Sequence, residues 1–132
     1  MKKPNTVYVI DDDKIYTYLL SRQIKSTDFC NQTLIFNNGL EAIEHLTVIQ
    51  QSNEELPDVI LLDLNMPVMD GWQFLDAFED LMLSKNITIY IVSSSIDEAD
   101  HKRAEGYSVR NFYVKPMSKD NLTEIKKDNM SA

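Results

Sequence analysis

The sequence predicts an α/β fold with a doubly wound, five-stranded parallel sheet and five helices. Short apolar or β-branched runs recur along the 132 residues, and segments with helical spacing lie between them. Several runs lack the alternation of a half-exposed strand, which indicates burial on both faces, as in a parallel sheet. Strict alternation of strand and helix favours right-handed crossovers that place helices on both sides of this sheet.

The predicted strands are the five apolar runs. In chain order they are TVYVI (6–10), TLIF (33–36), VILLDL (59–64), ITIYIVS (87–93) and NFYVK (111–115). Turn-forming or polar residues follow each run, so the chain leaves the sheet there.

The predicted helices occupy the segments between and after these runs. They span residues 13–26, 38–51, 70–84, 97–108 and 118–128. Asp13 is expected to cap the first of them by accepting backbone N–H groups. That helix carries two stripes, of which the first is suited to the core. The first stripe comprises Tyr16, Leu19, Leu20 and Ile24, and the second comprises Ile15, Tyr18 and Arg22.

Composition limits the classes of function. We expect one domain over residues 4–129 with no output domain attached, and a net charge of −8 argues against non-specific nucleic-acid binding. No apolar stretch approaches the roughly 18 residues that suggest membrane insertion, so a cytoplasmic location is expected. The single Cys30 forbids an internal disulfide, fits a reducing compartment and is expected to be a passive residue.

Polar residues stand where the predicted strands end. In parallel sheets, sites form outside the carboxyl ends of the strands, at a topological switch point. The residues at those ends are Asp11, Asp12 and Asp13, then Asp63, then Ser93, Ser94 and Ser95, and finally Lys115 and Pro116. The strand over 33–36 ends in asparagines and offers nothing comparable.

The carboxylates of Asp11, Asp12 and Asp63 would lie close together in one small site. Two such charges about 4 Å apart repel by about 4 kcal/mol at an effective dielectric near 20, so a proton, a cation or a metal must compensate. Hard oxygen ligands suit Mg²⁺, which retains waters and binds phosphates. Ser93 and Lys115 can donate to phosphate oxygens. We therefore interpret Asp63 as a nucleophile that forms an aspartyl phosphate.

Four motifs in this order resemble the receiver domains of two-component response regulators. They are YVIDDD, LLDLNMPVMDG, IYIVSSS and FYVKPM, which together cover almost the whole chain. The resemblance implies the flavodoxin-like receiver fold with strand order 2-1-3-4-5. It also implies a chemotaxis-type, stand-alone signalling protein rather than an enzyme, with only slow self-dephosphorylation.

The resemblance also implies a role for each site residue. Asp63 is the phosphoacceptor, and Mg²⁺ is bound directly by Asp12, Asp63 and the backbone carbonyl of Asn65, with Asp11 acting through water. Ser93 and Phe112 form the switch, and Lys115 pairs with the acids. Pro116, after a typically cis peptide bond, and Gly71 support the site structurally. Ser93 stands where threonine is common, and Phe112 where tyrosine is frequent.

Partners follow from the same resemblance. The phosphoryl donor is a histidine kinase or a histidine phosphotransfer protein, and the output is contact with a downstream protein or further relay of the phosphoryl group. Ile15 and Tyr18 are either ordinary exposed surface or the docking site of the donor, and Met117 is predicted to extend that patch. The two histidines, His45 and His101, are expected to be exposed.

Two rival interpretations remain open. A Mg²⁺-dependent phosphohydrolase would need a second acid two residues after the nucleophile, where this chain has Asn65, which cannot act as a general acid. A receiver-shaped interaction module that no longer accepts phosphate would bind its partner even after an Asp63→Asn substitution.

Overall fold

The computed structural model describes residues 2–130 and contains the predicted parallel sheet. Its strands are β1 (Thr6–Ile10), β2 (Gln32–Phe36), β3 (Val59–Leu62), β4 (Thr88–Ser93) and β5 (Asn111–Val114). Their order across the sheet is β2-β1-β3-β4-β5, which confirms the doubly wound fold and the strand order implied by the resemblance.

Five helices alternate with the strands, also as predicted. They are α1 (Lys14–Ser26), α2 (Gly39–Ile49), α3 (Gly71–Asp80), α4 (Glu98–Ala104) and α5 (Lys119–Asp128). Helices α3 and α4 are shorter than expected. Just after α3, Met82 adopts a left-handed φ of 49°, and beyond α4 the chain closes a turn in which Tyr107 N–H donates to the Ala104 carbonyl.

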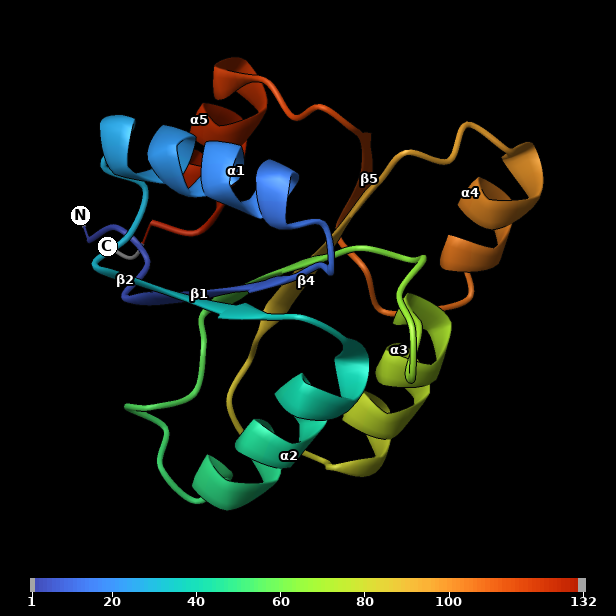
Figure 1. Cartoon of the computed structure of the whole chain (residues 1–132). Coiled ribbons are helices and arrows are strands. Elements are labelled where there is room, and N and C mark those ends of the chain that lie inside the picture. The colour runs from blue at the N-terminus through green and yellow to red at the C-terminus, as the bar shows by residue number, and fades with distance from the viewer. Residues whose placement is uncertain (1, 131–132) are drawn as a thin grey trace.

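The sheet separates two helical layers (Figure 1). Helices α1 and α5 cover one face, α2 and α3 cover the other, and α4 stands beside β5. Alternate residues of β1 enter the two cores: Val7 and Val9 pack toward α1 and α5, whereas Tyr8 and Ile10 pack toward α2 and α3. All five residues of β1 are buried, which explains why this run lacks a period of two.

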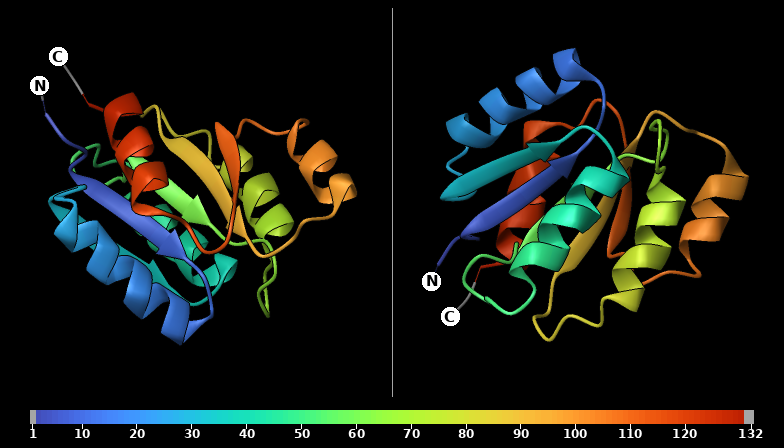
Figure 2. Two further views of the ribbon diagram at one scale, coloured as in Figure 1. Left: turned by 90° about the horizontal axis from the view of Figure 1, so that it is seen from above. Right: turned by 60° about the horizontal axis from the view of Figure 1, so that its bottom comes forward.

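All strands point the same way, so their carboxyl ends meet at one edge of the sheet (Figure 2). Hydrogen bonds continue the ladder one residue beyond the strands. Asp11 N–H donates to the Phe36 carbonyl and Asp63 N–H to the Ile10 carbonyl, both at 2.9 Å. The sheet therefore fixes the backbone of Asp11 and Asp63.

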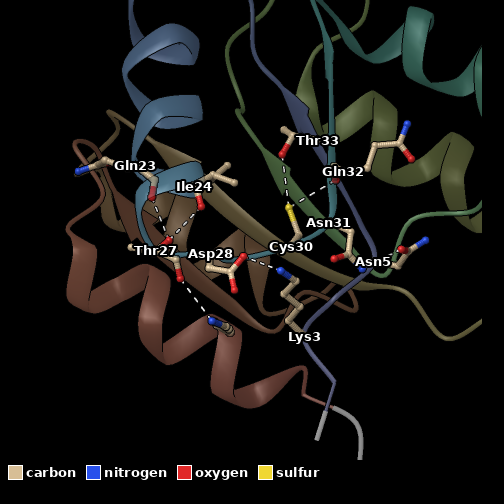
Figure 3. A network of polar contacts seen from close by, with 11 residues as sticks. Lys3, Asn5, Gln23, Ile24, Thr27, Asp28, Cys30, Asn31, Gln32 and Thr33 are labelled. Carbon is tan, nitrogen blue, oxygen red and sulfur yellow. Dashed lines mark hydrogen bonds and ion pairs between the residues drawn. The ribbon is translucent and has the colours of Figure 1, made fainter.

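Polar contacts also connect the segments at the opposite edge of the sheet, where the amino ends of the strands lie. Figure 3 shows the part beside the end of α1, where the Cys30 thiol lies 3.4 Å from both the Gln32 carbonyl and the Thr33 hydroxyl. Burial raises the pKa of the Cys30 thiol, which agrees with a passive role. Among residues 2–130, no helix combines the length and the apolar character needed to cross a membrane.

Gly71, the first residue of α3, lies against the backbone that carries Asp63. A Cβ at this position would stand 2.6 Å from the Asp63 carbonyl oxygen and 2.8 Å from the Leu64 Cα. Gly71 N–H also donates to the Leu64 carbonyl, so the helix cannot shift away without losing a hydrogen bond. Gly71 therefore leaves no room for a side chain between α3 and the segment that follows β3.

We expect Gly71→Ala to lower the free energy of unfolding by about 1–3 kcal/mol, because backbone atoms must move to admit the methyl group. Urea titration followed by circular dichroism measures the change. Gly106→Ala is the matched control, since its Cβ would meet only the Arg103 carbonyl at 3.4 Å. A loss no larger for Gly71→Ala than for Gly106→Ala would contradict the steric argument.

Candidate functional site

Three carboxylates converge at the carboxyl edge of the sheet. Asp11, Asp12 and Asp63 each place a carboxylate oxygen within 4.8 Å of the others. Asp11 and Asp63 are only 4% and 6% exposed, whereas Asp12 is exposed. The cluster predicted from the strand ends therefore exists, and one of its members is open to solvent.

The ammonium of Lys115 reaches this cluster from the end of β5. Its Nζ lies 2.7 Å from Asp11 Oδ2 and 3.7 Å from Asp63 Oδ2. The ring of Tyr16 lies below the ammonium, with 4.6 Å between Nζ and the ring centroid. Burial alone would lower the pKa of Lys115, but the hydrogen bond to Asp11 and the charges of Asp63 and Asp11 outweigh it and raise the pKa. Lys115 is therefore charged.

The surroundings of Asp63 raise the pKa of its carboxyl group. Burial and the charge of Asp11 raise its pKa from 3.8 to about 6, although Lys115 and the backbone N–H of Leu64 oppose the shift. That N–H donates to Asp63 Oδ1 at 2.9 Å and fixes the orientation of the carboxylate. A group that titrates this close to neutrality responds strongly to an added cation.

The donor set fits a hard divalent cation. The three converging acids offer carboxylate oxygens, and one ammonium pairs with two of them, so negative charge is in excess. Asn65 is exposed in the loop that follows β3, two residues after Asp63. Mg²⁺ prefers such oxygen ligands and retains waters on its open positions.

Ser93 is the last residue of β4, the strand next to β3, and Phe112 lies on β5. Ser93 is fully buried, its carbonyl accepts from Lys115 N–H at 2.8 Å, and its hydroxyl oxygen accepts from Ser95 N–H at 3.3 Å. Phe112 is half-buried and pairs in register with Ile91, two residues before Ser93. The Lys115–Pro116 peptide bond is cis, as the resemblance implied.

The expectation that both histidines are exposed is wrong. His45 and His101 are half-buried. The ring of His45 lies 5.4 Å from that of Phe36, and the ring of His101 stacks on Phe112 with 3.7 Å between centroids. These aromatic contacts partly cover each imidazole. They depend on how α2 and α4 are placed against the sheet, and the spacing of residues in the sequence does not specify that placement.

The proposed docking patch is only partly as predicted. Ile15 and Tyr18 are 76% and 61% exposed on α1. Leu19, expected in the core, is also 53% exposed and extends this patch. Met117 does not extend it: it is 2% exposed within the core under α1 and α5, because its N–H donates to the Tyr16 hydroxyl and holds the segment inward.

Residues 7–127 match the family model described as the response regulator receiver domain. The chain belongs to this family. The curated relative "Probable methanogenesis regulatory protein FilR2" of Methanothrix harundinacea is 24% identical over 119 residues, which cover 90% of this chain and 77% of that protein. Some of the other curated relatives are much longer: this chain spans 67% of the response regulator Rcp1 of Synechocystis but only 14% of the sensor histidine kinase CheAY of Helicobacter pylori.

Solved structures of receivers have the same fold. A two-component response regulator from Cytophaga hutchinsonii superposes with a TM-score of 0.86 at 27% identity, covering 96% of this chain and 97% of that one. The phosphorylated cyanobacterial phytochrome response regulator RcpA superposes with a TM-score of 0.74 at 26% identity, covering 94% of this chain and 89% of that one.

The receiver also uses Tyr16 in a way that sequence analysis missed. Its ring supports the Lys115 ammonium, and its hydroxyl accepts from Met117 N–H at 3.2 Å. The apolar spacing of α1 suggested only a core residue. The signal that was available is the position of Tyr16 three residues after Asp13, in the first turn beside the acids.

We expect Asp63→Asn to stabilise the metal-free protein. The folded pKa of about 6 exceeds the ordinary 3.8, so the folded state binds the extra proton between these values and the free energy of unfolding falls as pH rises through them. At about pH 7.5 the substitution should add about 1–3 kcal/mol, and near pH 4 the gain should disappear. Urea unfolding in EDTA at both pH values measures this.

The control for this substitution is Asp12→Asn, which removes an exposed charge from the same cluster and should change stability less. A gain for Asp63→Asn that is equal at both pH values would contradict the assignment of the shift to Asp63.

Proposed function

We propose that this receiver accepts a phosphoryl group onto Asp63 from a phosphohistidine on a histidine kinase or phosphotransfer protein, in a Mg²⁺-dependent reaction. The observation that carries the proposal is the convergence of three carboxylates at the carboxyl edge of the sheet, two of which, Asp11 and Asp63, face Lys115. A buried excess of negative charge is tolerated where a cation and a phosphoryl group are to be bound.

Asp63 is the group best suited to be the nucleophile. Its Oδ1 is held by Leu64 N–H, and its Oδ2 faces Lys115 at 3.7 Å. In the transfer, a carboxylate oxygen forms a bond to phosphorus and the bond between phosphorus and the imidazole nitrogen breaks. The imidazole, which carries a proton on its other ring nitrogen, leaves as the neutral ring with that electron pair. The product is an acyl phosphate, which water hydrolyses slowly.

The remaining groups bind and orient the phosphoryl oxygens. Asp12, Asp63 and the Asn65 carbonyl would hold the metal, with Asp11 acting through water, and Mg²⁺ would supply positive charge opposite the phosphoryl oxygens. Lys115 is charged and can donate to one oxygen, and the Ser93 hydroxyl can donate to another. The relative RcpA, 26% identical, is described as phosphorylated, which supports this assignment.

The output would be a change of surface. Contact between Ser93 and the phosphoryl group would let Phe112 follow, which would alter the face built from α4, β5 and α5 and bias a two-state equilibrium. That face would bind a downstream protein, or the phosphoryl group would pass to another histidine.

We expect intact mass spectrometry to find one added phosphoryl group after incubation with Mg²⁺ and acetyl phosphate, and none on Asp63→Asn. Asp58→Asn is the matched control, because Asp58 is occupied by Lys85 at 2.9 Å on the opposite edge. An adduct on Asp63→Asn would overturn the proposed site. An adduct that forms on wild type when EDTA replaces Mg²⁺ would overturn the proposed metal dependence.

The docking patch predicts a separate effect. Ile15→Ala combined with Tyr18→Ala should slow transfer from a phosphohistidine donor by about tenfold, because these side chains contact the donor and not the acids. The same variant should react with acetyl phosphate at the wild-type rate. Val48→Ala, at an 83% exposed position on α2, is the control. Equal donor rates for the two variants would identify the patch as ordinary surface.

A further inference from the structure

The shortest distance between two aromatic rings among the described residues joins α4 to β5. The imidazole of His101 stacks on the ring of Phe112 with 3.7 Å between centroids and 21° between the planes. Both side chains are half-buried. The proposed function assigns a change of position to Phe112. The ring of His101 lies on its face and therefore affects how easily Phe112 can move.

The same imidazole is connected to the switch hydroxyl. His101 Nε2 lies 3.4 Å from the Ser95 carbonyl oxygen, and Ser95 N–H donates to Ser93 Oγ at 3.3 Å. The Ser95 hydroxyl in turn donates to Asp100 Oδ2 at 2.7 Å, next to His101 on α4. A continuous set of contacts therefore runs from Ser93 through Ser95 and His101 to Phe112.

Helix α4 has few other attachments. Of its seven residues, all of which the structure describes, Ala104 alone is buried. Its remaining aromatic contact is the guanidinium of Arg103, 4.5 Å from the centroid of the Trp72 ring, and just beyond the helix the Tyr107 hydroxyl donates to Asp76 at 2.9 Å. With so little buried area, the His101 stack is a large part of what holds α4 in place.

The position of Phe112 explains what this stack opposes. Phe112 pairs in register with Ile91, and Ser93 lies two residues further along β4, so Phe112 and Ser93 occupy the same face of the sheet. A movement of the Phe112 ring toward Ser93 therefore stays on this face and requires the ring to leave His101, or requires α4 to move with it.

We propose that His101 is a positioning residue that stabilises the resting arrangement of Phe112 and α4 through this stack. The proposal rests on the proposed function, in which a ligand bound at Asp63 contacts Ser93 and Phe112 then moves. Loosening the stack shifts the equilibrium toward the activated form, and a ligand that binds that form better then binds more tightly.

The test is a titration of the full chain with beryllofluoride in saturating Mg²⁺, followed by the fluorescence of Trp72. Trp72 is the only tryptophan and lies against Arg103 of α4, so it reports on α4 directly. The variants are His101→Ala, which removes the ring, and His101→Phe, which keeps a stacking ring and loses the nitrogen. His45→Ala is the matched control, because it removes a half-buried histidine near Phe36, away from the acids.

We expect His101→Ala to bind beryllofluoride about threefold to tenfold more tightly than wild type, as the loss of one aromatic pair implies. His101→Phe should restore wild-type affinity, and His45→Ala should leave it unchanged. In a Phe112→Ala background, His101→Ala should have no further effect, which a residue that merely supports the fold would not show. Urea unfolding of each variant verifies that it is folded under the assay conditions.

Three results would overturn the inference: an affinity for His101→Ala within twofold of wild type or weaker, equal affinities for His101→Phe and His101→Ala, or an undiminished effect of His101→Ala in the Phe112→Ala background. Failure of the proposed function has a different signature. In that case wild type would bind beryllofluoride no better than Asp63→Asn does, whatever residue stands at position 101.

Discussion

The ion pairs that Lys115 forms with Asp11 and Asp63 are the interactions on which the site depends. Two buried carboxylates stand at the ends of the adjacent strands β1 and β3, and the hydrogen bond from Asp63 N–H to the Ile10 carbonyl holds these strand ends together. One ammonium compensates part of their repulsion, yet burial and the charge of Asp11 still raise the pKa of Asp63. The fold therefore holds more negative than positive charge at the site, and a bound cation can neutralise the excess.

The two edges of the sheet differ in how completely their polar groups are satisfied. At the amino edge, Lys85 donates to the carbonyls of Asn53 and Leu56 and pairs with Asp58, so its donors are occupied. At the carboxyl edge, the acids outnumber the available cation. The excess negative charge therefore lies at the carboxyl edge, where an added cation can neutralise it.

The fold and the acid cluster were predictable because both follow from short-range pattern. Buried runs identify strands, alternation with helices makes the sheet parallel, and a parallel sheet brings its carboxyl ends together, so Asp11, Asp63 and Lys115 had to meet. The exposure of Leu19, the burial of Met117 and the stacking of His101 depend on how each helix is rotated and placed against the sheet. A single amphipathic pattern leaves that placement undetermined, particularly for the short and polar α4.

The slight burial of α4 has a consequence for how this molecule opens. Because Ala104 is the only residue of that helix which is buried, separating it from the sheet exposes little apolar area, and its amide protons should exchange with solvent through local opening long before those of β1 or β3. We therefore expect the amide protons of the central sheet to exchange slowly and those of the peripheral helix α4 to exchange through local opening. A partner that binds the form in which α4 has left the sheet would need to overcome only the free energy of opening α4. That free energy is a small part of the free energy of unfolding the whole domain.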